Sequence, residues 1–149
     1  MKTRYIIFAD DDPDDLELIT GFFKQYNQQV NVLELKDGKE VLKFLNDFSS
    51  SLDLPILIVL DINMPRMDEF ETTLWLKNTY PLVHVLALSM YDDKDAIIRM
   101  IKNGAKGYIF KNIDPKELRT AIKAVMTKGF YYSDMDRGKM LHNILYKDK

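Results

Sequence analysis

Asp61 directly follows the uninterrupted aliphatic run 56–60, where a carboxylate is well placed to act as a nucleophile or a metal ligand. The run is short, rich in β-branched residues and free of polar alternation, which is typical of a strand buried on both faces. Because Pro65 cannot continue a central strand, the chain must turn between Asn63 and Met67 and leave Asp61 at the strand end. Taken alone, such an aspartate more often forms hydrogen bonds within its own loop.

Other groups able to do chemistry follow three further strand-like runs. Asp10, Asp11 and Asp12 follow residues 5–9, Ser89 follows 83–88, and Lys111 follows 107–110. In an open α/β sheet, ligands bind at the carboxyl ends of the strands, near the point where the strand order reverses. These acids, the hydroxyl and the amine are therefore the candidate site residues.

Strand-like runs and stretches of helical periodicity alternate along the chain. The candidate strands are 5–9, 30–35, 56–60, 83–88 and 107–110. Between them, apolar residues at helical spacing share a face in successive groups: Leu16, Ile19 and Phe23; Val41, Leu42, Leu45 and Phe48; Phe70 and Leu74; Ile97, Met100 and Ile101. Regular alternation of strand and helix needs crossover connections, so we expect a mostly parallel sheet with helices on both faces.

A further helix after the last strand is marked by its capping residues. Asp114 is suited to the N-cap, Pro115 to the first helical position and Glu117 to the third, and Gly129 is expected to end the helix. Its inward-facing residues are predicted to be Leu118, Ala121, Ile122 and Val125.

The composition favours one soluble domain inside the cell. A chain of 149 residues with 46% hydrophobic residues can bury one core but is short for two ordinary domains. The net charge of −2 gives no basic excess for nucleic acid or an anionic membrane. The absence of cysteine excludes disulfides and suits a reducing cytoplasm, and no segment has the length of a signal peptide or membrane helix.

The segments FADDDPDDLELI, LDINMPRMD, ALS and GYIFK, in this order and spacing, resemble the receiver domain of two-component response regulators. The resemblance covers roughly residues 3–128 and implies a flavodoxin-like, doubly wound sheet of five parallel strands in the order 2-1-3-4-5. That order makes the first and third strands neighbours, which brings Asp10 and Asp11 against Asp61. We therefore expect a receiver domain at 1–128 and a partly helical linker or tail at 129–149.

The resemblance implies a regulatory domain, one that catalyses only its own phosphoryl transfer and slow dephosphorylation. Asp61 is then the nucleophile that accepts a phosphoryl group from a sensor histidine kinase, a phosphotransfer protein or a small acyl phosphate. In this family Lys111 would bind a phosphoryl oxygen and Ser89 would donate a hydrogen bond to it. Tyr108 would move with Ser89, and the two together would form the switch.

A magnesium ion is the expected cofactor. Carboxylates that converge in one crevice repel one another, and a small dication that prefers oxygen ligands is the usual remedy. The resemblance assigns carboxylate ligands to Asp11 and Asp61, a backbone carbonyl ligand to Asn63, and the orientation of a bound water to Asp10.

Simpler interpretations exist for several acidic residues. Asp12 before Pro13 is a good helix cap, and Asp14 and Asp15 favour the helix dipole, which accounts for these three acids without a metal. A calcium loop of the EF-hand type that begins at Asp10 is excluded, because Asp15 and Gly21 stand where glycine and glutamate are required.

Other residues that attract attention are predicted to be structural. His84 and His142 lack the spacing of metal ligands, and Trp75 is expected to pack on the third helix. Taken singly, Ser89, Lys111 and Tyr108 would be a strand-end hydroxyl, a surface lysine and a core aromatic residue.

Two positions depart from the family pattern. Asn112 follows Lys111 where the family has proline in a cis bond; since a non-proline cis bond costs about 3–4 kcal/mol, the isomer here is left open. Glu69 occupies a position that is commonly glycine, and this extra acid could alter metal affinity or partner docking.

The segment 129–149 is similar to those that lead from a receiver to a helix-turn-helix output domain that controls transcription. The chain has no room for that domain, which favours a truncated chain over a single-domain receiver. We expect DNA binding only through the absent domain, and a phosphorylation-dependent homodimer as one form of output.

Two other classes of protein fit the sequence less well than a receiver. A phosphatase of the haloacid dehalogenase type usually has a second aspartate two residues beyond its nucleophile, where this chain has Asn63. A flavodoxin-like FMN carrier needs a phosphate-binding loop after the first strand, but acids stand there and would repel a phosphate.

Overall fold

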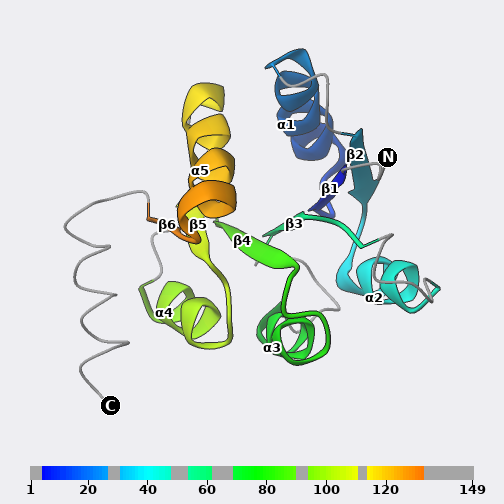
Figure 1. The fold of residues 1–149 in the computed structure, drawn as a ribbon. Coiled ribbons are helices and arrows are strands. Elements are labelled where there is room, and N and C mark those ends of the chain that lie inside the picture. Colours follow the sequence, from blue (N-terminus) through cyan, green and yellow to red (C-terminus); the bar gives the residue numbers. More distant parts are fainter. Residues whose placement is uncertain are drawn as a thin grey trace.

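Six strands form one parallel sheet in the computed structural model, which describes residues 5–26, 31–47, 54–61, 69–89, 94–110 and 114–132. The strands are β1 (Tyr5–Ala9), β2 (Asn31–Leu35), β3 (Leu57–Asp61), β4 (His84–Ser89), β5 (Gly107–Phe110) and β6 (Tyr131–Tyr132). The helices are α1 (Pro13–Tyr26), α2 (Gly38–Asn46), α3 (Glu69–Thr79), α4 (Lys94–Lys102) and α5 (Pro115–Lys128). The order β2-β1-β3-β4-β5-β6 confirms the predicted α/β class and the order 2-1-3-4-5 of the first five strands (Figure 1).

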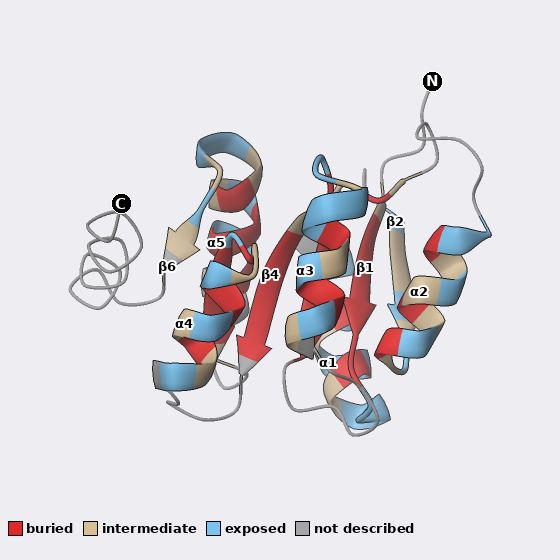
Figure 2. Ribbon diagram, turned by 90° about the horizontal axis from the view of Figure 1, so that it is seen from below, coloured by how far each residue is buried: buried red, intermediate tan, exposed pale blue. Residues whose placement is uncertain are grey.

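Helices cover both faces of the sheet because side chains alternate along each strand. Ile7 and Ile58 belong to the cluster under α2, α3 and α4, whereas Ile6 and Leu57 belong to the cluster under α1 and α5. All four side chains are buried. Figure 2 shows the same division, with buried central strands and helices that are exposed on their outer sides. The site at the strand ends therefore rests on a sheet packed on both faces.

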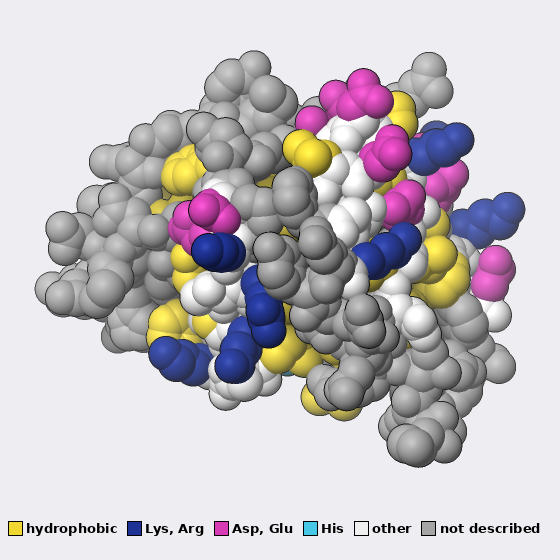
Figure 3. All heavy atoms as spheres, turned by 90° about the horizontal axis from the view of Figure 1, so that it is seen from above, with side chains coloured by type: hydrophobic (Ala, Val, Ile, Leu, Met, Phe, Trp, Pro, Cys, Tyr) yellow, Lys and Arg dark blue, Asp and Glu magenta, His cyan; other side chains and the backbone are white. Residues whose placement is uncertain are grey.

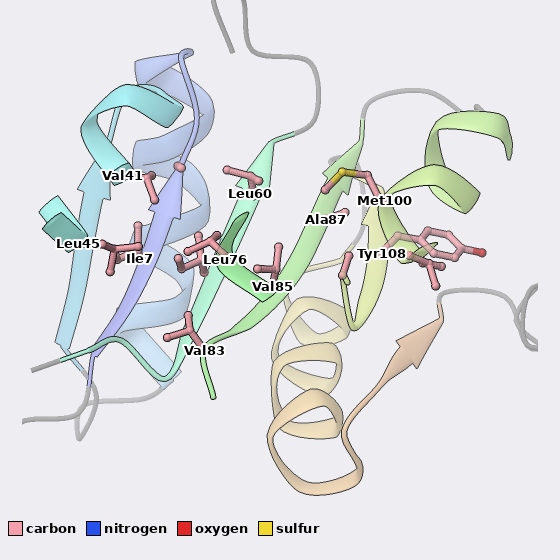
Figure 4. Close-up of a cluster of buried hydrophobic side chains, with 14 of the residues drawn as sticks. Ile7, Val41, Leu45, Leu60, Leu76, Val83, Val85, Ala87, Met100 and Tyr108 are labelled. Carbon is pink, nitrogen blue, oxygen red and sulfur yellow. The ribbon is translucent and has the colours of Figure 1, made fainter. Parts of the chain in front are cut away.

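The first of these clusters joins three helices to the sheet. Figure 4 labels ten of its side chains, which come from the strands, from the residue before β4, and from α2, α3 and α4. They are Ile7, Leu60, Val83, Val85, Ala87, Tyr108, Val41, Leu45, Leu76 and Met100. Of the apolar residues predicted for α2, Val41 and Leu45 take part in it, Leu42 does not, and Phe48 lies outside the described residues. The predicted residues of α4 also belong to this cluster, and those of α5 pack in the other one.

The ends of β3 and β4 differ from the prediction by one residue. Asp61 and Ser89 are the last residues of their strands, rather than the first residues after them. The aliphatic run predicts which residues are buried, whereas the strand extends as far as its backbone pairs with a neighbouring strand. Asp61 still pairs with Leu88 of β4, so it belongs to β3. β2 begins at Asn31, and the predicted first residue, Val30, lies outside the described residues.

The inner face of α3 also differs from the prediction. The pattern places Leu74 on one apolar face with Phe70, but Leu74 is 41% exposed. Thr73 and Leu76 are fully buried instead, three residues apart on the inner side of the helix. A threonine can occupy the core because its methyl group packs there, while its hydroxyl lies 3.8 Å from the Met100 sulfur as a donor.

The predicted capping residues of α1 and α5 are found in the structure. The Asp12 carboxylate accepts a hydrogen bond from the Asp14 N–H at 2.9 Å, at the start of α1. Asp114 accepts from the Lys116 N–H at 2.8 Å, at the start of α5. Gly129 ends α5 with φ +90°, a left-handed conformation that glycine adopts without strain.

β6 is absent from the sequence prediction, which assigns residues 129–149 to a linker or tail. Its two residues extend the sheet beyond β5, while 133–149 lie outside the described residues. The predicted boundary at 128 and the predicted helix in the tail stay predictions. Within the described part of the chain, no helix has the length and apolar character needed to cross a membrane.

Candidate functional site

Asp61 ends the central strand β3, between β1 and β4. β1 runs parallel to β3 with Ala9 opposite Leu60, so Asp10 is carried to the position beside Asp61. Asp61 and Asp10 are only 1% and 2% exposed. Because burial of neighbouring carboxylates costs free energy unless charge or hydrogen bonds compensate for it, this arrangement favours a cation.

The turn between β1 and α1 holds Asp10 in place. The Asp10 N–H donates to the Leu35 carbonyl at 3.1 Å, which ties the end of β1 to the end of β2. Its Oδ1 accepts a hydrogen bond from the Asp12 N–H at 3.0 Å. The orientation of the first carboxylate is thus fixed by backbone groups of its own turn.

Asp11 completes a group of three carboxylates. One oxygen each of Asp10, Asp11 and Asp61 lie within 4.8 Å of one another. Asp11 is exposed, whereas the other two are buried, so the group opens to solvent on the side of Asp11. Oxygen donors at this spacing suit a hard dication such as Mg²⁺. The expected proximity of Asp10 and Asp11 to Asp61 is found, and their roles stay predictions.

The other predicted site residues are described only in part. Ser89 ends β4 with its backbone opposite Phe110, the last residue of β5, and its side chain is outside the description. Asn63, Lys111 and the Lys111–Asn112 bond also lie outside the described residues. The pairing of β4 with β5 nevertheless brings the chain at Ser89 next to the residue that precedes Lys111.

Tyr108, the predicted partner of Ser89 in the switch, is fully buried in β5. Its ring makes an edge-to-face contact with Phe110, with centroids 5.9 Å apart. We expect from the resemblance that phosphorylation turns this ring inward, but it already lies inside. The role of Tyr108 as a switch stays a prediction, and it cannot consist of a movement from solvent into the core starting from this conformation.

A contact between α3 and α4 is not foreseen by the sequence prediction. The Arg99 guanidinium lies over the Phe70 ring, 4.0 Å from its centroid, and the Asn103 side-chain amide donates to the Phe70 carbonyl at 3.2 Å. Phe70 is the second residue of α3, the helix that follows Asp61 in the chain. The i, i+4 spacing of Arg99 and Asn103 predicts a shared helix face, but not the partner.

The remaining conspicuous residues are structural where described, as predicted. Trp75 packs edge-to-face on Tyr80, with ring centroids 5.6 Å apart. His84 is half-buried in β4, and its burial, followed by the charge of Lys106, lowers the pKa of its imidazole. A neutral histidine here suits packing. His142 lies outside the described residues.

Acidic side chains at the start of α1 add negative charge next to the site. The face seen in Figure 3 as a whole mixes Asp and Glu side chains with Lys and Arg side chains. The acids of the first turn of α1, Asp14 and Asp15, follow the carboxylate group in the chain. They add to the negative field at the site, which favours a cation there.

The chain belongs to the response regulator receiver domain family, whose model matches residues 6–123. It is 33% identical over 114 residues to the transcriptional regulatory protein DegU of Brevibacillus brevis, a match that covers 76% of this chain and 44% of that protein. It is 31% identical over 134 residues to the oxygen regulatory protein NreC of Staphylococcus aureus, covering 87% of this chain and 58% of that protein.

These relatives agree with the predicted branch of transcriptional regulators, and the chain spans about half of their length. Among solved structures, a LuxR-family two-component response regulator from Aurantimonas sp. has a TM-score of 0.77 at 22% identity, with 94% of this chain and 96% of that chain covered. The receiver domain of the response regulator NarL from Mycobacterium tuberculosis has a TM-score of 0.71 at 25% identity, with coverage of 84% and 96%.

Proposed function

We propose that this receiver domain accepts a phosphoryl group on Asp61 from a histidine kinase, a phosphotransfer protein or a small acyl phosphate. The observation that carries the proposal is the group formed by Asp10, Asp11 and Asp61, whose oxygens lie within 4.8 Å of one another at the ends of neighbouring strands. Asp61 is the acceptor because it ends the rigid central strand, while Asp10 is held by its own turn and Asp11 is exposed.

The reaction is a displacement at phosphorus. A carboxylate oxygen of Asp61 forms a bond to the phosphorus atom as the bond to the donor breaks, and the electron pair of that bond leaves with the imidazole nitrogen or the acyl oxygen. The product is an aspartyl phosphate. The protein's own contribution is alignment of the nucleophile and stabilisation of charge on the phosphoryl oxygens.

Magnesium fits the donor set of this site. Asp11 and Asp61 would hold it through carboxylate oxygens and Asn63 through its backbone carbonyl, with Asp10 orienting a bound water. When bound, the ion neutralises charge on the carboxylates and on the phosphoryl oxygens. Lys111 would bind a phosphoryl oxygen, and Ser89 would donate a hydrogen bond to the group once it is present.

Incubation with acetyl phosphate and magnesium tests this function. We expect the intact mass of the chain to rise by one phosphoryl group and to return slowly to its first value. The alternative, a phosphatase of the haloacid dehalogenase type, would release many equivalents of inorganic phosphate without a lasting adduct. Rapid multiple turnover would therefore contradict the receiver function.

Magnesium affinity should depend on Asp11 far more than on Asp12. We expect Asp11→Ala to weaken magnesium binding by tenfold or more, roughly the range for loss of a metal-site group. Asp12→Ala is the matched control, because Asp12 caps α1 and its loss should lower stability by about 1 kcal/mol with little effect on affinity. Calorimetric titration measures both variants, and equal losses of affinity would show that the ligands are wrongly assigned.

The output of the switch is proposed to be transcriptional, through a helix-turn-helix domain outside this chain, in a cytoplasmic protein. Phosphorylation would bias the surface formed by α4, β5 and α5 between two states. Support comes from transcriptional regulators among the relatives and from the contacts that join α3, the helix after Asp61 in the chain, to α4.

This chain alone should not bind promoter DNA specifically, because its net charge of −2 supplies no electrostatic term and no recognition helix is evident in its sequence. A beryllofluoride mimic should nevertheless shift it toward a dimer. Gel-shift assays and sedimentation velocity measure the two effects. Tight specific DNA binding would contradict the first expectation, and an unchanged sedimentation profile the second.

A further inference from the structure

β6, the last described strand, pairs with β5 and forms the edge of the sheet. Its register places Tyr131 opposite Gly107 and Tyr132 opposite Tyr108 in β5. The Tyr131 N–H donates to the Lys106 carbonyl at 3.0 Å. Figure 1 shows β6 beside β5, and Figure 2 shows β6 at the outer edge of the molecule's described part. The edge that β5 would otherwise present is therefore occupied, over two residues, by the chain's own C-terminal segment.

Gly107 makes this close approach possible. A Cβ atom at Gly107 would lie 2.1 Å from the Tyr131 carbonyl oxygen, and its three nearest atoms would all belong to the Tyr131 backbone. A side chain at this position would collide first with β6, since none of those atoms comes from the other strands. The glycine is therefore required for docking of β6 rather than for the five-stranded sheet.

The Tyr131 side chain joins β6 to α5 as well. Its hydroxyl donates to the Glu117 carboxylate at 3.0 Å, and its ring packs against the cluster that contains the α5 residues. Burial, then the hydrogen bond and charge of Glu117, raise the pKa of Tyr131 to about 12. The hydroxyl therefore stays protonated and able to donate at neutral pH. Gly129 turns the chain from α5 back toward β5.

We propose that phosphorylation of Asp61 loosens β6 from β5, so that the strand Tyr131–Tyr132 transmits the state of the site to the residues that follow. The inference rests on the function proposed above and names the segment that carries its output. It assigns β6 the role of a strap that is docked in the unphosphorylated chain.

The reason for loosening lies in the two attachments of β6. β5 is four residues long and leads directly into Lys111, which the phosphoryl group would attract. A pull on Lys111 shifts β5 relative to α5, yet β6 is bonded to both elements through Tyr131. Such a shift must weaken one set of contacts. A strand of two residues has few hydrogen bonds to lose, so a small displacement suffices to open it.

Hydrogen exchange at the Tyr131 amide, whose N–H donates to the Lys106 carbonyl, tests the proposal in the full chain. Samples with and without acetyl phosphate and magnesium are compared, and the adduct at Asp61 is quantified by mass in the same samples. We expect exchange at β6 to become roughly tenfold faster in the phosphorylated chain, as for loss of about one hydrogen bond's protection. Unchanged or slower exchange with a full adduct would overturn this inference alone. Failure to form the adduct would overturn the proposed function and this inference with it.

Variants that weaken the docking of β6 directly provide a second test of the proposal. Gly107→Ala should expose the Tyr131 amide before phosphorylation, with a similar increase in exchange, and phosphorylation should then add nothing further. Gly21→Ala is the matched control, because its Cβ would have open space around it and β6 should stay docked. Tyr131→Phe removes only the hydroxyl bonded to Glu117, and it replaces Gly107→Ala if that variant does not fold. A protected Tyr131 amide in both variants would overturn the docking role.

Discussion

The Asp61→Asn variant should take up no phosphoryl group from acetyl phosphate, where the wild-type chain should gain about one. An amide oxygen is not a nucleophile toward phosphorus, and the neighbouring Asp10 and Asp11 are held by a turn and exposed to solvent, respectively. Asparagine has nearly the same shape as aspartate, and the substitution removes one negative charge from three carboxylates that repel one another. The fold should therefore be retained or stabilised. Intact-mass analysis and thermal unfolding measure the two effects.

Asp47→Asn is the matched control for this experiment. Asp47 is exposed at the end of α2, so the same chemical change there should leave phosphorylation unaltered. Full labelling of Asp61→Asn would show that another residue is the acceptor. Loss of labelling in both variants would point to a general effect of removing negative charge.

Ile58→Ala should lower the free energy of unfolding by about 2–5 kcal/mol, the range for removing a large aliphatic side chain from a packed core. Ile58 is fully buried in β3, three residues before Asp61, and packs in the cluster under α2, α3 and α4. The void left by the substitution can collapse only partly, because helices cover both faces of the sheet. Urea denaturation measures the change.

Leu82→Ala serves as the control, because Leu82 is 86% exposed and its loss should change stability by less than about 0.5 kcal/mol. A loss below about 1 kcal/mol in Ile58→Ala would mean that β3 is not the packed central strand that positions the acceptor. The comparison therefore tests the foundation of the site rather than its chemistry.

Much of the fold can be predicted from local patterns. β1 and β5 have the predicted bounds, since each is an apolar run followed by charged residues. The caps at Asp12, Asp114 and Gly129 are likewise local, because a cap needs only its own side chain and the next turn. The strand order came from the resemblance, since no local pattern encodes which strands are neighbours.

The misassigned parts depend on contacts between distant segments. In α3, hydrophobicity alone favours Leu74, but the packing against Met100 selects Thr73 for the inner face. β6 is two residues long, and its docking depends on the absence of a side chain at Gly107, more than twenty positions earlier. Neither relation can be recognised from a short window of sequence.

The same distinction applies to the site. That Asp10 and Asp11 meet Asp61 follows from strand order together with the position of acids at strand ends, and the structure places these groups together. The burial of Tyr108 agrees with its simpler interpretation as a core aromatic residue, whereas the contact of its ring with Phe110 depends on packing that the sequence pattern does not encode.

Peptide mapping of the chain after reaction with acetyl phosphate and magnesium is the most direct test of the central claim. The account predicts that the phosphoryl group is found on the peptide that contains β3, attached to Asp61. A phosphoryl group on Asp10 or Asp11 instead would contradict the assignment of the acceptor, even if the chain still gained one adduct.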